Sequence, residues 1–442
     1  MPDGNANYKD EMKKFDLKSQ DRLVDLKQID CWMQESQFSD AMVVKSSTLL
    51  RSNSWVFTDG SIQHVSKRFF SVIGVEWSEL GKTSASIFLE QREIGTLGVI
   101  ARRSNDGLEI LLNAKAEPGN FGFVQLAPTC QATASNADQV HGGTPPPFSN
   151  YFLSPHGEII SDSLQSEHGM RFFGKLNRNI FIVDCDSQEL TAQHRWVSFR
   201  LLASMLDKDF RVNTDLRSVL CCTDWACLAG GVPFAEGEDF AQELRKSFLA
   251  CPRPHILAAV LKRLDELRCR SKNLSFIDVR SVAGFSCSFD TAPTLSNGAQ
   301  SLQHIEVQSC LREVHAWDQP ILEDTEEQVI DLFCARGSAG LVFAFRAQWE
   351  PGLVRGAELA PTVQGPKTDS PDFGNVRLSV RQSDEGGRFY HCISNYRIID
   401  VGEVIYQDDY LWLTLAEIRV LLSACMFNNE SRSALSLLLR YL

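Results

Sequence analysis

Residues 117–131 read EPGNFGFVQLAPTCQ, and residues 350–364 read EPGLVRGAELAPTVQ. The two stretches begin with the same Glu-Pro-Gly, carry Leu-Ala-Pro-Thr at the same distance from it, and end on Gln. Because proline fixes φ and glycine permits a turn, each stretch predicts a corner that leads into a short strand. A match of this length inside one chain indicates an internal repeat.

Two further blocks repeat in the same order. Residues 165–173 read QSEHGMRFF and return at 382–390 as QSDEGGRFY, while NTDLRSVL at 213–220 returns at 428–435 as NNESRSAL. The offset in residue number between matching blocks changes slightly along the chain, as loops of different length in the two copies would cause. Apolar runs, a Pro/Gly corner and a helix near Arg-Ser occur in each copy, so we expect an α+β unit that is used twice.

The periodicity of apolar residues predicts the elements around these blocks. Strands are expected at 108–114 and 341–347, and helices at 196–206 and 413–424. Residues 10–50 are expected to be helical, and residues 240–270 to form two helices separated by prolines. The predicted division is a helical N-terminal extension at 1–50, a first repeat at 51–235, a helical linker and crossover at 236–300, and a second repeat at 301–442.

Some repeated residues read as structural rather than functional. The asparagines that open the Arg-Ser blocks suit helix caps, and their arginines suit a buried pair that closes the fold. Tryptophans shortly before those blocks suit the core. The residues concerned are Asn213, Asn428, Arg217, Arg432, Trp196 and Trp412.

Composition excludes several classes of protein. The net charge of −12 and the pI near 5.3 argue against a nucleic-acid binder, which needs clustered Lys and Arg. The first 20 residues hold no apolar core of signal-peptide length, and no stretch of about 18 apolar residues occurs, so we expect a cytoplasmic protein away from the membrane. The 13 cysteines are irregularly spaced, which favours reduced thiols over disulfides or zinc knuckles.

The repeated blocks resemble the NDP-hexose 2,3-dehydratases of deoxysugar pathways. In the first copy the resemblance rests on Glu117-Pro-Gly-Asn, Val124 to Thr133, Gln165-Ser-Glu and Leu176-Asn-Arg-Asn. In the second copy it rests on Glu350-Pro-Gly, Leu359 to Gln364, Gln382 to His391 and Asn428 to Leu435, in the family's order. It extends from about Trp55 to the C-terminus.

The resemblance implies a homodimer whose halves each have a Nudix-like fold, acting on dTDP-4-keto-6-deoxyglucose without a nicotinamide, flavin or pyridoxal cofactor. The glutamate-rich box of Nudix hydrolases is absent from both copies, so pyrophosphate hydrolysis is not expected. The chain departs from the family after Asn136, where Ala137, Asp138 and Gln139 replace an expected aromatic and a basic residue. This departure puts one ligand contact in doubt.

The implied reaction needs a base for the C3 proton, which the C4 ketone acidifies, stabilisation of an enolate, and an acid for the C2 hydroxyl. The enol product tautomerises to a 3,4-diketo-2,6-dideoxy sugar, so no redox cofactor and no metal are required. No GxGxxG motif opens a βαβ unit, in agreement with this expectation. A downstream 3-ketoreductase would consume the diketone.

Acids and histidines in the Gln-Ser blocks are the candidates for catalysis. A carboxylate or imidazole in a closed pocket can have its pKa moved toward neutrality. The alternative is that the acid after Gln-Ser binds backbone amides in the adjoining turn. We expect one of the Tyr-His pair to face the pocket, since neighbours on a strand point to opposite faces. The candidates are Asp384, Glu385, Tyr390 and His391, with Glu167 and His168 as their counterparts.

Basic and amide side chains near the same blocks are candidates for binding the nucleotide. Guanidinium groups suit a diphosphate, and amides and hydroxyls suit a thymine edge and a ribose. The candidates are Gln131, Thr133, Ser135, Asn136, Arg171, Lys175, Arg178, Gln364, Arg388 and Arg397.

The second copy has the fuller acid–base set, so catalysis is expected there, with ligand binding open to both copies. Two other functions remain open from sequence. One is a nucleotide-sugar-binding protein without activity, and the other is an isomerase that shares the enolate step but keeps the hydroxyl.

Overall fold

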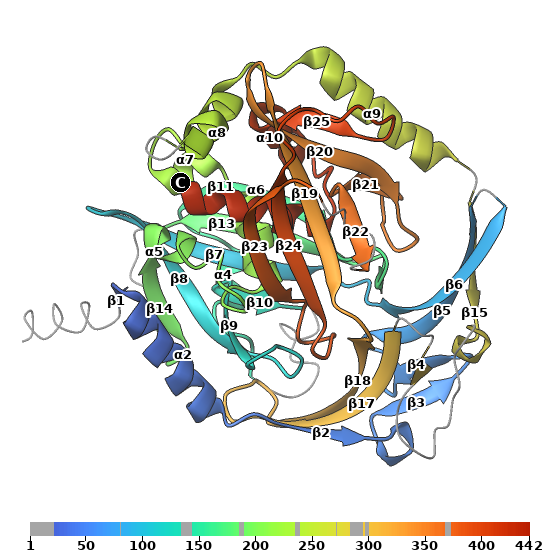
Figure 1. The fold of residues 1–442 in the computed structure, drawn as a ribbon. Helices are drawn as coiled ribbons and strands as arrows, with labels where there is room; N and C mark the ends of the chain where they lie inside the picture. Colours follow the sequence, from blue (N-terminus) through green and yellow to red (C-terminus); the bar gives the residue numbers. More distant parts are fainter. Residues whose placement is uncertain are drawn as a thin grey trace, which may run out of the picture.

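The computed structural model describes residues 22–79, 81–133, 144–184, 190–234, 239–270, 272–282, 295–296, 300–366 and 373–442. Below, residues 51–235 are called the first half and residues 301–442 the second half. Figure 1 shows the two halves side by side, with the sheets of both meeting at the centre of the molecule.

The main sheet of the first half has the strand order β1-β14-β8-β7-β13-β11, with β9 beside β8 and β10 beside β7. Its β7 and β13 run parallel, while β7 and β8 form an antiparallel hairpin. The strands are β1 (Arg22–Leu23), β7 (Gly95–Ser104), β8 (Gly107–Ala116), β9 (Val124–Ala127), β10 (Cys130–Ala132), β11 (Glu158–Ser166), β13 (Leu176–Val183) and β14 (His194–Ser198).

The main sheet of the second half repeats this order as β25-β20-β19-β24-β23, with β21 beside β20 and β22 beside β19. Again the pair that corresponds to β7 and β13, namely β19 and β24, is parallel. The strands are β19 (Gln328–Gly337), β20 (Gly340–Trp349), β21 (Ala357–Ala360), β22 (Val363–Pro366), β23 (Asn375–Ser383), β24 (Ile393–Asp400) and β25 (Leu411–Thr414). That this unit is Nudix-like stays a prediction.

A smaller sheet precedes each main sheet, and each contains a strand from outside its own half. Strand β15 of the linker pairs with β5 of the first half, whereas β2 of the N-terminal extension pairs with β17 of the second half. The strands are β2 (Val43–Ser47), β3 (Trp55–Thr58), β4 (Ser61–His64), β5 (Ser71–Glu79), β6 (Lys82–Glu90), β12 (Phe172–Phe173), β15 (Asn273–Ile277), β16 (Leu295–Ser296), β17 (Gln300–Gln308) and β18 (Ala316–Asp324).

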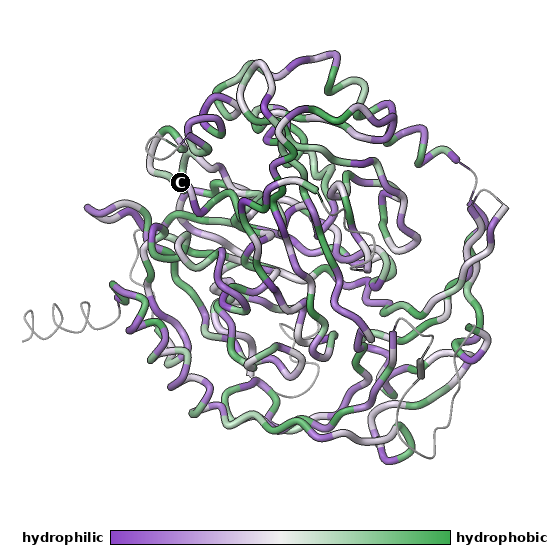
Figure 2. The backbone as a smooth tube through the Cα atoms, in the orientation of Figure 1, coloured by the Kyte–Doolittle hydropathy of each residue, from purple (hydrophilic) through white to green (hydrophobic). Residues whose placement is uncertain are grey.

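Helices cover the sheets and join the halves. The short helices α6 and α11 lie against each other at the centre, and one core cluster includes both Leu220 of α6 and Leu435 of α11. Hydrophilic and hydrophobic stretches alternate along the peripheral α2 and α9 in Figure 2, as expected of helices with one face on a core. The helices are α2 (Leu26–Asp40), α4 (Ser149–Leu153), α5 (Phe199–Ala203), α6 (Thr214–Cys222), α7 (Trp225–Ala229), α8 (Asp239–Leu249), α9 (Pro254–Cys269), α10 (Leu415–Ser423), α11 (Asn429–Ser436), and the short 3₁₀ turns η1 (Leu49–Arg51), η2 (Val279–Ser281) and η4 (Leu437–Tyr441).

The repeated Arg-Ser blocks are structural, as expected. Asn213 and Asn428 cap α6 and α11 through their side chains. The guanidinium of Arg432 donates to backbone oxygens of Phe427 (2.6 Å) and Ser166 (2.5 Å). Since Ser166 belongs to the other half, this buried arginine helps to hold the halves together.

Three helices begin or end at other residues than the sequence predicted. Within the described part of 10–50, the helix spans only Leu26–Asp40, because Asp25 caps it and the next residues join the edge of β17. Residues 196–198 and 413–414 belong to strands, and the helices start after the capping Ser198 and Thr414. Trp196 is buried and Trp412 half-buried. No helix in the described ranges is long and apolar enough to cross a membrane.

Candidate functional site

The Glu-Pro-Gly corner of each half docks on the Gln-Ser loop of the other half. Gly119 donates its backbone N–H to the oxygen of Gly386 at 2.8 Å, and Gly352 donates to the oxygen of Gly169 at 2.8 Å. A Cβ at Gly119 would lie 1.8 Å from the carbonyl oxygen of Phe389, so only glycine fits this approach. We call the docking of 117–119 on 383–391 the first corner, and that of 350–352 on 166–174 the second corner.

The glutamate of each corner is held by the repeated glutamine. At the first corner, Gln131 donates to Glu117 (3.1 Å) and accepts from the capping Asn213 (3.2 Å). The second corner repeats this chain with Gln364, Glu350 and Asn428. Both glutamines, predicted to read the nucleotide, are thus used to fix a corner carboxylate.

The two corners differ in charge. Glu117 forms an ion pair with Lys115 at 3.1 Å, whereas Glu350 accepts a neutral hydrogen bond from Gln348 at 2.9 Å. Burial, and then the carboxylates of Glu430 and Glu358, raise the pKa of Glu350 to about 8. The second corner therefore holds a carboxyl group that carries a proton at neutral pH.

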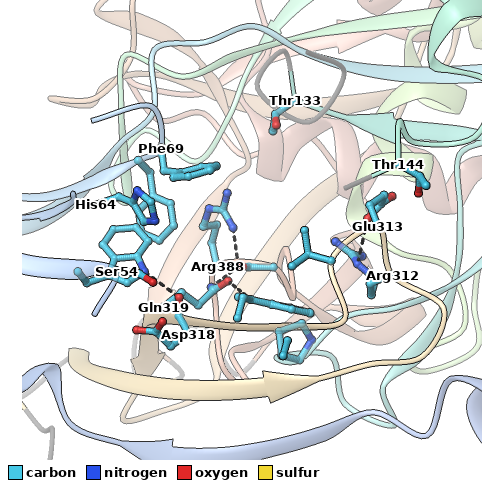
Figure 3. Close-up of a pocket in the computed structure, with 17 residues that line it drawn as sticks. Ser54, His64, Phe69, Thr133, Thr144, Arg312, Glu313, Asp318, Gln319 and Arg388 are labelled. Atoms are coloured by element: carbon cyan, nitrogen blue, oxygen red, sulfur yellow. Dashed lines mark hydrogen bonds and ion pairs between the residues drawn. The ribbon is translucent and has the colours of Figure 1, made fainter. Parts of the chain in front are cut away.

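A cavity of about 320 Å³ opens beside the first corner (Figure 3). The aromatic wall comes from β3, β4 and the turn after them, and Asp318 of β18 adjoins it by accepting from Nε1 of Trp55 at 2.7 Å. Arg312 and Glu313, from the loop before β18, lie across the cavity, and Figure 3 shows Arg388 between these two sides. The lining includes Trp55, His64, Phe69, Phe70, Pro118, Thr133, Arg312, Glu313, Trp317, Asp318, Gln319, Gly387 and Arg388.

Arg388 is a cation without a carboxylate partner in the described part of the chain. Its Nη1 donates to the oxygen of Gly387 at 2.8 Å, its plane lies over Phe70 at 4.3 Å, and its buried Nε has no hydrogen-bond partner. Burial lowers the pKa of this guanidinium, and the carboxylate of Glu385 is the strongest opposing charge. An anion in the cavity would supply the missing partner.

Arg171, which matches Arg388 in the repeat, is neutralised instead. Its guanidinium donates to Asp384 at 2.7 Å and forms a second ion pair with Asp324 at 2.5 Å. Asp324, Asp384 and Cys392 are close enough to share a metal ion, but Arg171 already binds both carboxylates. The geometry therefore favours a structural role for Asp384 and Arg171 over the predicted catalytic and binding ones.

Glu385, one of the predicted catalytic residues, lies close to the cavity wall. A Cβ at the cavity-lining Gly387 would be 3.5 Å from Oε1 of Glu385 and 3.7 Å from Oε1 of Glu117. Burial lowers the pKa of Lys175, and Glu385 is the strongest charge that opposes this shift. Lys175 donates from Nζ to the oxygen of Glu93 at 3.0 Å.

Burial acts on the ionisation of several acids and a histidine in the Gln-Ser and Arg-Ser blocks. Burial, and then Glu167 and Glu385, raise the pKa of Asp215 well above its ordinary value. Burial also raises the pKa of Glu167, whose oxygens accept from Asn177 (2.7 Å) and Asn429 (3.0 Å). His168 pairs with Glu430 at 2.8 Å, and although burial opposes its charge, Glu430 raises its pKa to about 9.

Tyr390 and His391 were expected to point to opposite faces of a strand, and this expectation is wrong. They lie in a turn where His391 has φ of 50°, and their rings stack at 4.2 Å. His391 is exposed, and neither residue belongs to the lining of the cavity. Their catalytic roles stay predictions that this placement does not favour.

The other predicted binding residues are dispersed. Thr133 lines the cavity, while Ser135, Asn136 and the 137–139 departure lie outside the described residues. Arg178 binds Asp162 through two hydrogen bonds (2.8 and 2.6 Å), and Arg397 binds Asp331 in the same way (2.7 and 2.8 Å). These two pairs join neighbouring strands, and none of the four residues is part of the cavity lining.

Sequence reasoning missed most of the cavity lining. Trp55, His64 and Phe69 come from the first half, whereas Arg312 and Trp317 come from the second. Aromatic density around residues 55–70 was the available signal. It could not be used, because nothing local shows that the β3–β4 hairpin faces β18 of the other half.

Fold and site together define a protein in which two related α+β halves meet at a cavity lined by a guanidinium group and aromatic rings. The chain belongs to the NDP-hexose 2,3-dehydratase family, whose model matches residues 26–223, 265–370 and 366–438. It is accordingly an enzyme of the carbon–oxygen lyase type.

Curated relatives carry one name, dTDP-4-dehydro-6-deoxy-alpha-D-glucopyranose 2,3-dehydratase. A protein from Saccharopolyspora spinosa is 30% identical over 91% of this chain and 89% of its own length. A protein from Streptomyces violaceoruber is 29% identical over 90% of this chain and 93% of its own length. A protein from Amycolatopsis orientalis is 27% identical over 92% of this chain and 88% of its own length. The similarity thus spans both halves and nearly the full length of each relative.

Proposed function

We propose that this chain removes the C2 hydroxyl from a dTDP-4-keto-6-deoxyhexose and yields a 3,4-diketo-2,6-dideoxy sugar nucleotide for deoxysugar biosynthesis. The names of the relatives support the substrate class. The single structural observation that supports it is Arg388, a cation on the cavity wall whose buried Nε lacks a partner. A diphosphate offers the oxygens that a guanidinium binds best.

In this proposal Arg388 anchors the diphosphate and Glu385 acts on the sugar. Glu385 takes the C3 proton, the electrons move toward the C4 ketone, and the C2–O bond then breaks. Where the C3 proton and the C2 hydroxyl lie on one face of the ring, the same carboxyl group can return the proton to the departing hydroxyl as water. The enol left behind tautomerises to the diketone, so no electrons are gained or lost.

The experiment is incubation of the purified protein with dTDP-4-keto-6-deoxyglucose in deuterated water, with a 3-ketoreductase and NADPH to trap the diketone. We expect a 2-deoxy sugar nucleotide with deuterium at C2. Exchange of the C3 proton without loss of water would indicate the isomerase, and tight binding without turnover would indicate a binding protein. An Arg388→Gln variant, expected to bind substrate weakly, is the control for the site.

We further propose that the protein works as a homodimer in the cytoplasm and that a 3-ketoreductase consumes its product. The diketone is reactive, which favours a reductase that acts on it directly. Sedimentation of the purified protein, alone and with the reductase, tests the oligomeric state and any association.

A further inference from the structure

His64 lies on the aromatic wall of the cavity that also contains Arg388. It is the last residue of β4, and Figure 3 shows it next to Phe69, on the side opposite Arg312 and Glu313. Its ring meets those of Trp55 and Phe69 edge to face, at centroid distances of 5.3 and 4.4 Å with interplanar angles of 82° in both cases. Contacts on two sides fix the orientation of the imidazole.

The hydrogen bonds of His64 determine which nitrogen carries the proton. Ser66 donates its backbone N–H to Nδ1 at 3.1 Å, and the Ser66 hydroxyl lies 2.7 Å from the same atom. Because a backbone N–H can only donate, Nδ1 accepts, and the proton of the neutral ring is on Nε2. Burial lowers the pKa of His64, an effect that Asp318 partly offsets, so the ring is neutral at pH 7.

The aromatic wall continues from His64 to the anion-binding group. The rings of Trp55 and Phe70 pack with their centroids 4.7 Å apart, and Cζ of Arg388 lies over the Phe70 ring, 4.3 Å from its centroid. A nucleotide has a flat base and a diphosphate, which match flat aromatic surfaces and a guanidinium, respectively. On this wall, Nε2–H of His64 is a neutral donor, which suits an uncharged carbonyl oxygen.

We propose that His64 is a specificity-determining residue, whose Nε2–H donates a hydrogen bond to a carbonyl oxygen of the pyrimidine base of the bound nucleotide. This inference rests on the proposed function, because it assumes that Arg388 holds the diphosphate of the same ligand. It assigns base recognition to the β3–β4 hairpin of the first half, while the guanidinium comes from the second half. Each half thus contributes one end of the nucleotide site.

Two substitutions of His64 test the contributions of its two ring nitrogens separately. His64→Asn keeps a polar group near Nδ1 for Ser66 and removes the donor at Nε2, whereas His64→Gln places an amide donor near Nε2. Gln63→Ala is the matched control, since Gln63 bonds to Ser61 and does not line the cavity. Calorimetric titration with dTDP, which lacks the hexose, measures the nucleotide contact alone, and thermal melting shows whether each variant folds.

We expect His64→Asn to weaken dTDP binding about tenfold, and His64→Gln and Gln63→Ala to stay within about threefold of the parent protein. Unchanged dTDP affinity in His64→Asn, with the parent protein binding dTDP, overturns the inference but leaves the dehydratase proposal intact. A fall in kcat without loss of dTDP affinity also overturns it, since the donor would then serve the sugar. Failure of the parent protein to bind dTDP overturns both proposals.

Discussion

The backbone N–H of Gly119 donates to the carbonyl oxygen of Gly386 at 2.8 Å, which fastens a corner of the first half to a loop of the second. The same loop continues into Gly387 and Arg388, which line the cavity. The joining of the halves and the shape of the cavity therefore depend on one approach of two backbones.

Substitution Gly119→Ala is expected to weaken this approach. The added methyl group would lie 1.8 Å from the oxygen of Phe389, so a backbone must shift at a cost of about 3 kcal/mol. Urea unfolding measures the loss. Gly231→Ala, where a Cβ meets no atom within 4 Å among the described residues, is the control and should change stability by less than about 0.5 kcal/mol. Equal midpoints for both variants would show that the corner tolerates a side chain.

Substitution of Arg388 is expected to affect ligand binding, whereas substitution of Arg171, its counterpart in the repeat, is expected to affect stability. Arg388→Gln should weaken dTDP binding by about ten- to a hundredfold with little change in stability, because Arg388 forms no ion pair in the described structure and its hydrogen bond goes to the backbone oxygen of Gly387. Arg171→Gln should instead cost about 3 kcal/mol of stability, because it leaves Asp324 and Asp384 buried without their partner. Titration with dTDP and urea unfolding of both variants check this. Equal losses of dTDP affinity and of stability in the two variants would contradict the different roles given to the two arginines.

Replacement of Glu385 by Gln is expected to lower kcat by at least about a hundredfold while dTDP affinity stays within about threefold. The reason is that Glu385 is the carboxylate beside the cavity wall that no ion pair in the described structure engages, whereas Glu117 is paired with Lys115. His391→Asn is the comparison, and its exposed position predicts turnover close to that of the parent protein. A larger loss in His391→Asn than in Glu385→Gln would reverse the assignment.

Stability should fall as the pH rises from about 6.5 to 9. Glu350 and His168 both have pKa values raised by folding, to about 8 and about 9, so the folded protein binds more protons than the unfolded chain in this window. Each group contributes a slope of up to about 1.4 kcal/mol per pH unit.

The variant Glu350→Gln removes one of these protons and keeps an oxygen that accepts from Gln364 and Gln348. Its unfolding free energy should therefore depend less on pH than that of the parent protein between pH 6 and pH 8, and urea unfolding at both values measures this. An unchanged slope would mean that Glu350 is ionised in the folded protein.

The repeated blocks allowed several features to be predicted from sequence. Strands β8 and β20, helices α8 and α9, and the caps Asn213 and Asn428 lie where local patterns placed them. The family resemblance is confirmed by the match across the chain. These features depend on turn chemistry, periodicity and motif order, which are properties of neighbouring residues.

Other features were decided by contacts between distant segments. Arg171 and Arg388 occupy the same position in the repeat, yet one binds two carboxylates and the other faces a cavity. Strands β2 and β15 pair across the expected boundaries, and Gln131 and Gln364 hold carboxylates instead of facing the cavity.

The sequence by itself thus determined the repeat, the turns, the helix caps and the family. Only the tertiary structure decided which of the two arginines forms ion pairs, which acids are paired and which aromatic residues line the cavity. The physical reason is that burial and charge pairing depend on atoms that folding brings together from both halves, whereas backbone propensity depends on the few residues on either side.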